Sequence, residues 1–221
     1  MSKRGPKPKS KIRIKWSSNF AYAIGLIATD GCVSSDGRHI EFTSKDLEQV
    51  ENFKMALKLS NSVTGKTRDR SKEKEYFRIQ FGDVKFVEYL QSIGITSAKS
   101  KTMKALKVPR KYFSDFLRGC FDGDGTFYSY WDKRWKSSFM FYLSFASASK
   151  DFALWLQDEV RTCAKVGGHM TVSNNMYQLR YAKKEAEILI RKMYCRSDTL
   201  FLKRKRLKIN GIFAMLHKHK V

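Results

Sequence analysis

The hydrophobic and polar positions of this chain form two series that repeat one another. Residues 23–31 read AIGLIATDG and residues 117–125 read LRGCFDGDG, so each segment is typical of an apolar helix that contains a glycine and ends at an acid followed by glycine. After each motif the period changes to that of a half-buried strand, then to a helix, a second strand ribbon and a closing helix. The pattern predicts helix, two strands, helix, two strands, helix, written twice.

Three further segments match between the two halves, in the same order. They are residues 40–42 with 143–145, 45–47 with 150–152, and 76–81 with 176–181. Chance similarity of two generic α+β stretches is the alternative, but four matched segments in one order favour a duplication. The expected fold is α+β, with two pseudo-twofold αββαββα half-domains.

The division of the chain follows from these repeats. The first fifteen residues are rich in Lys, Arg and Pro and offer little apolar surface to bury, so we expect a basic flexible arm. Pro109 suits the beginning of the second motif helix. The predicted parts are an arm over residues 1–15, an N-terminal half-domain over 16–100, a linker over 101–110 and a C-terminal half-domain over 111–221.

Charge narrows the class of partner. The 221 residues include 44 Lys and Arg against 21 Asp and Glu, a formal net charge of +23, which indicates a polyanionic partner, first of all nucleic acid. A basic ribosome-associated factor is the alternative on charge alone. No apolar run is long enough to span a membrane, and the basic N-terminus is not followed by the apolar segment of a signal peptide. We therefore expect no membrane partner. We expect a soluble intracellular protein, in a prokaryotic cytoplasm or nucleoid or in an organelle matrix.

The motif helices carry small residues four apart on one face, which allows two helix backbones to approach closely. These interface-packing residues are Gly25, Thr29, Gly119 and Gly123. Both helices would then bring an acid to the same place, at C-terminal ends where the helix dipole is already negative. For either acid alone, the alternative is a polar residue that merely ends the helix before the glycine. The pair instead favours Mg²⁺, with scissile phosphates and water completing its shell, and metal-assisted phosphodiester cleavage.

The two motifs resemble those of the LAGLIDADG homing endonucleases, and residues 116–125, FLRGCFDGDG, are close to a typical family form. The resemblance extends from about Ser17 to the C-terminus, and the two-motif layout is similar to that of the single-chain members, which act as monomers. It implies two four-stranded antiparallel saddle-shaped sheets over the DNA major groove, with the motif helices at the central interface. It also implies a site-specific endonuclease that cuts double-stranded DNA across the minor groove and leaves short 3′ overhangs.

The resemblance assigns the metal-binding catalytic role to the penultimate acid of each motif. These acids are Asp30 and Asp124, and the backbone carbonyls of Thr29 and Gly123 are further candidate ligands. The first motif departs from the consensus at Ala28, where an Asp is usual, but retains the metal-binding acid. We expect Mn²⁺ to substitute for Mg²⁺, and Ca²⁺ to support binding without cleavage.

Members of this family also place a basic residue near the scissile phosphates. In the second half Lys205, within a basic run, fits this role, and in the first half either Lys99 or Lys101 could serve. Such a lysine would polarise water or stabilise charge on the phosphorane. A solvated charge run is the alternative for both halves.

Strand alternation predicts the side chains that face the DNA, because alternate residues point to opposite faces of a sheet. Arg and Gln can make bidentate contacts to guanine and adenine. The predicted outward residues are Tyr76, Arg78, Gln80, Gln178 and Arg180, and further cations for phosphates or bases are Lys66, Arg68, Arg70, Lys133, Arg134 and Lys136. Since the halves differ at these positions, the target is expected to be long and not palindromic.

Three other interpretations of the sequence compete with this one. Residues 122–126 also read DGDGT, as in haloacid dehalogenase-type phosphatases, but polar residues interrupt the strand that such a motif must follow. An EF-hand fails because loop positions six and twelve would be Phe127 and Lys133. The serious alternative is a non-cleaving nucleic-acid-binding protein on the same scaffold, either a transcription regulator or a group I intron maturase, which makes intron RNA a second candidate partner.

The charge predicts a steep salt dependence of DNA binding. If about ten cations contact phosphates, log K should fall against log salt with a slope of about −9. Fluorescence anisotropy with labelled duplex between roughly 50 and 200 mM salt measures this slope. A slope near −2 would contradict an extended phosphate contact.

Overall fold

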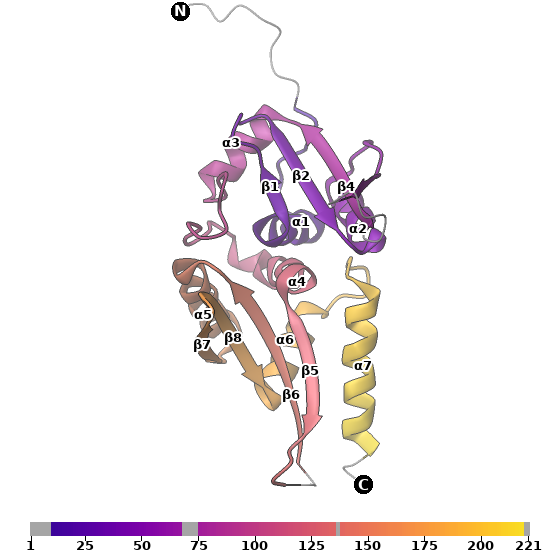
Figure 1. Ribbon diagram of the computed structural model, residues 1–221, viewed down its shortest axis with the longest axis vertical. Helices are drawn as coiled ribbons and strands as arrows, with labels where there is room; N and C mark the ends of the chain where they lie inside the picture. Colours follow the sequence, from indigo (N-terminus) through magenta and orange to yellow (C-terminus); the bar gives the residue numbers. More distant parts are fainter. Residues whose placement is uncertain (1–9, 68–74, 136–137, 219–221) are drawn as a thin grey trace, which may run out of the picture.

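The computed structural model describes residues 10–67, 75–135 and 138–218, and it divides into two halves whose main contact is made by one helix from each (Figure 1). The first half follows the predicted order of helix, two strands, helix, two strands and helix. Its elements are α1 (Ser18–Thr29), β1 (Gly31–Val33), β2 (His39–Ser44), α2 (Leu47–Leu57), β3 (Thr64–Thr67), β4 (Glu75–Gly82) and α3 (Val84–Ser92).

The second half repeats this order and then adds one helix. Its elements are the 3-10 turn η1 (Arg110–Tyr112), α4 (Phe113–Asp124), β5 (Thr126–Trp131), β6 (Phe139–Ser147), α5 (Lys150–Ala164), β7 (His169–Ser173), β8 (Met176–Ala182), α6 (Lys183–Met193) and α7 (Lys203–Lys218). The predicted duplicated α+β fold is therefore confirmed. Helix α7 was not predicted from the repeat.

Each half contains one four-stranded antiparallel sheet, with strand orders β1-β2-β4-β3 and β5-β6-β8-β7. The register is equivalent in the two sheets, since Phe42 pairs with Ile79 and Phe145 pairs with Leu179. The matches of 40–42 with 143–145 and of 76–81 with 176–181 are therefore correct.

The helices that follow align differently from the sequence match. Asp46 and Ser149 occupy the same position at the start of α2 and α5, because the backbone N–H of each donates to the serine hydroxyl two residues before it, at 3.0 Å in both halves. The match of residues 45–47 with 150–152 is thus wrong by two residues. The hydrogen-bonded turn at the helix start, and not the Lys-Asp pair, fixes the alignment.

The cores lie between the sheets and the helices, as strand alternation predicts. In β4, Ile79 and Phe81 are buried whereas Gln80 is exposed. Helix α7 extends the second core, because Phe213 contacts the rings of Phe127 and Phe141 with centroids 6.1 and 5.9 Å apart. It lies alongside β5 in Figure 1.

The two halves are joined by a very close contact between α1 and α4. A Cβ atom built on Gly25 would lie 2.2 Å from the carbonyl oxygen of Phe116, and one on Gly119 would lie 2.1 Å from that of Tyr22. One on Gly123 would lie 2.0 Å from Oγ1 of Thr29. Gly25 and Gly119 therefore allow a contact between the two backbones, and Gly123 leaves room for the side chain of Thr29.

Two segments expected to connect or extend the half-domains are packed against them. The backbone N–H groups of Lys11 and Ile12 donate to Oδ2 of Asp83 at 2.6 and 2.8 Å, and Ile12 is buried. Lys11 and Ile12, within the predicted arm, thus contact the first half, while residues 1–9 lie outside the described part of the chain. In the linker, Met103 and Leu106 are also buried.

Within the described ranges, no helix combines the length and the apolar composition needed to cross a membrane.

The glycine contact predicts a severe effect of a single methyl group. Gly119→Ala places Cβ against backbone atoms that cannot rotate away, so we expect a loss of unfolding free energy of at least about 3 kcal/mol, measured by urea denaturation. The matched control is Gly211→Ala on exposed α7, where nothing lies within 4 Å of the added atom. There we expect a neutral or slightly stabilising change of about 0.5 kcal/mol. A Gly119→Ala protein within about 1 kcal/mol of the wild type would contradict the contact.

Candidate active site

Two acids are placed at the ends of the packed motif helices. Asp30 caps α1, donating its N–H to the carbonyl of Leu26 at 2.9 Å, and Asp124 is the last residue of α4. Each is followed by a glycine that turns directly into the first strand of its sheet. At Gly31 and Gly125 a Cβ would lie 2.7 and 2.6 Å from backbone atoms of the preceding helix, so glycine is needed for this turn.

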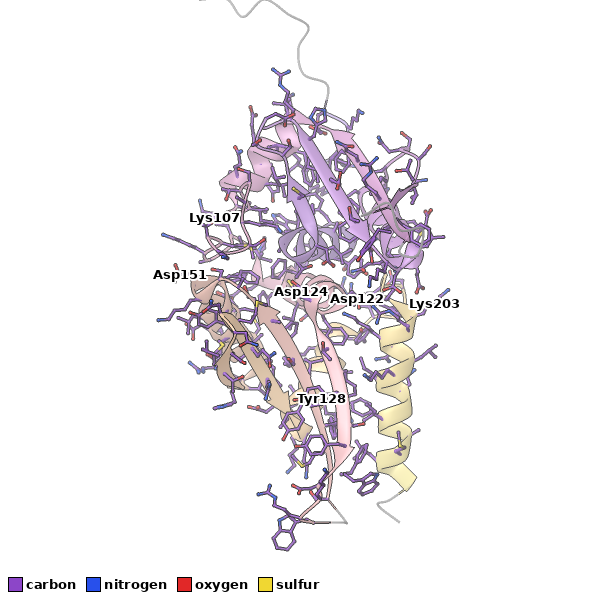
Figure 2. The ribbon with its side chains drawn as sticks, viewed as in Figure 1. Lys107, Asp122, Asp124, Tyr128, Asp151 and Lys203 are labelled. Atoms are coloured by element: carbon purple, nitrogen blue, oxygen red, sulfur yellow. The ribbon has the colours of Figure 1, made fainter. Side chains whose placement is uncertain are left out.

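The two carboxylates lie close enough to perturb each other. Burial and then the charge of Asp124 raise the pKa of Asp30 to about 6. The pKa of Asp124 is also raised, because the surrounding protein removes part of its water even though its side chain remains exposed. Figure 2 places Asp124 and its neighbour Asp122 at the middle of the molecule, between the two halves. The structure thus brings the two predicted acids together.

A lysine lies at the end of each motif helix. Nζ of Lys205 donates to the carbonyls of Phe121, Asp122, Gly123 and Gly125, at distances between 2.6 and 3.1 Å. Burial lowers its pKa to about 8, against the opposing attraction of nearby carboxylates.

In the first half, Lys99 takes the equivalent place. This side chain is buried, and Nζ donates to the carbonyl of Thr29 at 3.2 Å. Burial lowers the pKa of Lys99, whereas the charges of Asp124 and Asp30 raise it. Lys101 is exposed, so of the two first-half candidates the structure brings Lys99 to the acids. The carbonyls of Thr29 and Gly123, both candidate metal ligands, each accept a hydrogen bond from one of these lysines.

Gln49, on α2, is a member of the site that sequence reasoning missed. Its Nε2 donates to Oδ2 of Asp30 at 3.3 Å and to the carbonyl of Asp122 at 3.0 Å, and its Oε1 accepts from the hydroxyl of Ser44 at 2.6 Å. The signal was a glutamine on the apolar face of α2, where it is buried. By the helix alignment described above, the corresponding residue of the second half is Phe152, so the two halves differ here.

Asp122, the extra acid of the second motif, holds other parts of the protein in place. It is buried and accepts hydrogen bonds from the Tyr22 hydroxyl and the Leu202 backbone N–H, both at 2.8 Å. Burial raises its pKa to about 6. By fixing Leu202, three residues before Lys205, it positions the lysine. The corresponding residue of the first motif is Ala28, which is buried and has no such partner to hold.

Each acid lines a separate cavity. Asp30 lines a cavity of about 470 Å³ together with Glu41, Lys45 and Arg204, and Asp124 lines one of about 180 Å³ that includes Lys99. Each of the two carboxylates therefore lines its own cavity.

The donor set suits a hard divalent cation. The described residues contain no group of three or more His, Cys, Asp and Glu that could hold a metal by themselves. Asp30 and Asp124 instead supply oxygen donors whose pKa values are raised by desolvation and, for Asp30, also by the charge of Asp124, and a cation would relieve both effects. Two carboxylates leave room for water and phosphate oxygens, the shell that Mg²⁺ prefers.

Those predicted DNA-facing residues whose side chains the structure describes lie on the outer faces of the sheets and in one hairpin. Arg78 pairs with Glu41 at 3.6 Å in the first sheet, and Arg180 hydrogen-bonds Gln178 in the second. Tyr76 and Gln80 lie on β4, and Lys133 and Arg134 in the β5–β6 hairpin. The side chains of Lys66, Arg68, Arg70 and Lys136 fall outside the described residues.

Sequence reasoning missed an aromatic cluster on the second sheet. Tyr142 stacks on Tyr128 and Tyr130, with ring centroids 5.3 and 6.1 Å apart. Tyr128 follows buried Phe127 on β5, so these tyrosines occupy the outer face. The alternation of aromatic residues along 127–131 was the available signal.

The raised pKa of Asp30 predicts a pH-dependent stability change. An acid whose pKa is higher in the folded state destabilises the fold as pH rises from about 4 to 6, and the cost persists above that range. Asp30→Asn should therefore raise the unfolding free energy by roughly 1 to 3 kcal/mol at pH 7.5 and by nearly nothing at pH 4.

Urea unfolding in EDTA at these two pH values measures the effect. The control is Asp36→Asn, since hydrogen bonds from Arg38 and His39 hold the pKa of Asp36 at about 2 and the sign is opposite. A stability gain for Asp30→Asn that is equal at both pH values would contradict the assignment.

Comparison with known proteins agrees with the motifs and the fold. A family model described as the LAGLIDADG-like domain matches residues 17–107. No curated protein sequence matches the chain. Among solved structures, the I-WcaI homing endonuclease bound to its DNA recognition sequence is 14% identical, with 93% of this chain and 94% of that chain covered and a TM-score of 0.63. The I-LtrWI LAGLIDADG homing endonuclease bound to target DNA is 12% identical, with 91% of each chain covered and a TM-score of 0.62.

A third similar structure is full-length DUF199/WhiA from Thermotoga maritima, 14% identical, with a TM-score of 0.60. The match covers 96% of this chain but 65% of that one, so the chain spans slightly less than two thirds of that protein. The predicted resemblance is confirmed: a LAGLIDADG-like family model matches the first half of the chain, and over nearly its full length the chain has the fold of solved LAGLIDADG homing endonucleases.

Proposed function

We propose that this protein is a site-specific endonuclease that hydrolyses phosphodiester bonds of double-stranded DNA with a divalent metal ion. The observation that carries the proposal is the meeting of Asp30 and Asp124, one from each half, at the end of a helix contact that costs the fold electrostatic energy. A protein that only bound DNA would gain nothing from two desolvated carboxylates that repel each other. The similar structures of I-WcaI and I-LtrWI are bound to their DNA targets, which supports duplex DNA as the partner.

In this mechanism Asp30 and Asp124 hold the metal, with Mg²⁺ as the natural ion, Mn²⁺ as a substitute and Ca²⁺ as an ion for binding without cleavage. A divalent ion held there would supply Lewis acidity at a scissile phosphate and would activate water for attack. Gln49 orients the Asp30 carboxylate by donating to Oδ2, leaving the second oxygen of that group for the metal. The partial desolvation of the site strengthens each of these charge interactions.

The two lysines have unequal roles. An ammonium group has three N–H donors, and Nζ of Lys205 is already surrounded by four carbonyl oxygens, so Lys205 is a positioning residue that fixes the end of α4. Lys99 makes one hydrogen bond within the described residues, to Thr29. Two of its donors therefore remain for a phosphate oxygen, and Lys99 stabilises the charge that develops there.

Recognition rests on the outer faces of the two sheets. The first face presents Arg78 and Gln80, which suit bidentate contacts to bases, and the second presents Arg180 beside stacked tyrosines. Because these faces differ, a monomer reads a long target without internal symmetry and cuts it across the minor groove, leaving short 3′ overhangs.

A second candidate function is nucleic-acid binding without cleavage, as a transcription regulator or an intron maturase. The observation in its favour is the similarity to WhiA, a protein whose name does not describe an endonuclease. The different surroundings of Lys205 and Lys99 would also be compatible with a protein that binds DNA without cutting it. The retained acid pair favours cleavage.

Cleavage of a randomised duplex library with Mg²⁺, followed by sequencing of the cut ends, tests the proposal. We expect double-strand cuts at one long motif, abolished by EDTA. Asp30→Asn and Asp124→Asn should each reduce cutting at least ~100-fold, because each removes a group that holds charge at the reacting phosphate.

The control is Asp158→Asn on the surface of α5, an exposed acid paired with Arg161, which should cut like the wild type. Both active-site variants should still bind the selected duplex in Ca²⁺. Binding by the wild type without any metal-dependent cut would establish the non-cleaving alternative instead, and full cutting by both variants would refute the site.

A further inference from the structure

A second cationic site lies where α1 begins. A cavity of about 430 Å³ is lined there by Trp16 and Phe20 at its floor and by exposed cationic side chains at its rim. The rim cations are Lys11, Arg13, Lys15 and Lys58. Among the residues that the structure describes, no acidic side chain lines the cavity. We call it the α1 basic cavity.

The rim charges are not neutralised by the protein. Arg204 and Arg78 pair with Asp46 and Glu41, whereas none of the four rim cations has an acidic partner within 4.0 Å among the residues that the structure describes. Two cations of the second half continue the same surface: Arg196 donates to Oγ of Ser18 at 2.6 Å, and Lys111 lies over the ring of Tyr112. Such an uncompensated cluster favours a polyanion.

The floor adds a flat aromatic surface. Trp16 stacks on Tyr112 with ring centroids 6.3 Å apart and planes at 15°, and Phe20 meets it edge to face at 5.5 Å. These contacts hold the indole in one orientation while it remains half-buried at the cavity. A fixed ring among lysines and arginines is the combination that stacks an unpaired base and tracks its phosphates.

The cavity is remote from the paired acids. It surrounds the first turn of α1, and Asp30 lies beyond the last, so the two are separated by the 12-residue helix, about 18 Å. None of its lining residues belongs to the outer sheet faces. Duplex DNA on those faces would therefore leave the cavity accessible.

We propose that the α1 basic cavity binds single-stranded nucleic acid, with phosphates on the rim cations and a base against Trp16. The bases of a duplex are stacked within the helix and do not present a free face to the indole, so the site selects single strands. An acidic peptide would satisfy the rim but would leave the aromatic floor unused. This proposal does not depend on nuclease activity, since it concerns other residues and an opposite end of α1.

Binding of fluorescein-labelled 15-mers of deoxythymidine and uridine to the full protein, followed by anisotropy in EDTA, tests the site. The variant Lys11→Gln/Arg13→Gln/Lys58→Gln should weaken binding at least ~10-fold near 0.1 M salt. It should also flatten the salt slope by about 2, since each lost single-strand contact contributes about 0.7. Tighter binding of one 15-mer indicates whether the natural ligand is RNA or DNA.

The matched control removes the same charge elsewhere: Lys165→Gln/Lys184→Gln/Lys208→Gln. Lys165 ends α5 in the left-handed conformation as Lys58 ends α2, so the backbone context is equivalent. The control should bind like the wild type, and both triple variants should keep its melting temperature and its cutting of duplex DNA. If both triple variants weakened oligonucleotide binding equally, the effect would come from the overall charge of the protein, and the proposal would be overturned. Absence of binding by the wild type would overturn it as well.

Tryptophan fluorescence locates the oligonucleotide. We expect deoxythymidine 15-mer to quench the emission of the wild type, and Trp16→Phe to lose most of this quenching. Trp135→Phe, at an exposed position in the β5–β6 hairpin, should retain it. The reverse result would place the strand on the hairpin and overturn the proposal. Displacement of the 15-mer by polyglutamate at equal charge concentration would assign the cavity to acidic peptides and overturn it as well.

Discussion

The close backbone contact between α1 and α4 is the constraint on which the rest of the structure depends. At Gly25 and Gly119 the two helices approach until no Cβ can be accommodated on either side. This contact brings the two helix ends together, so Asp30 and Asp124 lie within range of each other's charge. The electrostatic cost is then set by backbone packing, and side-chain rotation cannot remove it.

The two halves share a fold, but the residues that surround the two acids differ between them. Equivalent sheet registers show how closely the backbones repeat. The polar groups around the acids do not repeat: Gln49 holds Asp30, whereas the corresponding position near Asp124 is Phe152. Duplication supplied two carboxylates, and divergence gave each of them a different environment.

The sequence was informative wherever the signal was local. Alternation along residues 76–81 predicted the buried face of β4, and the twin motifs predicted the helix contact, because both patterns are written within a few consecutive residues. The order of elements and the pairing of the acids followed from this.

The remaining features depend on tertiary partners that no local pattern reveals. Gln49 is part of the site because α2 packs beside α1 and the Gln49 side chain reaches the Asp122 carbonyl on α4. Asp83 holds the backbone at Lys11 and Ile12, where the Ile12 side chain is buried. From the sequence alone, the basic run around Lys205 could equally be a solvated surface. Asp122 positions this run by accepting a hydrogen bond from the backbone of Leu202, which lies eighty residues later in the chain.

The segment before α7 has a consequence for the order in which the molecule is assembled. The backbone N–H of Leu202 donates to Asp122 at 2.8 Å, and Arg204 donates three hydrogen bonds of 2.7 to 3.0 Å to the carboxylate of Asp46 in the first half. This late part of the chain therefore returns across both halves after their helices and sheets have been synthesised. Until it docks, the end of α4 lacks Lys205, and the acid pair faces only the lysine of the first half. The centre of the molecule is thus completed by a segment that the ribosome makes after both motif helices.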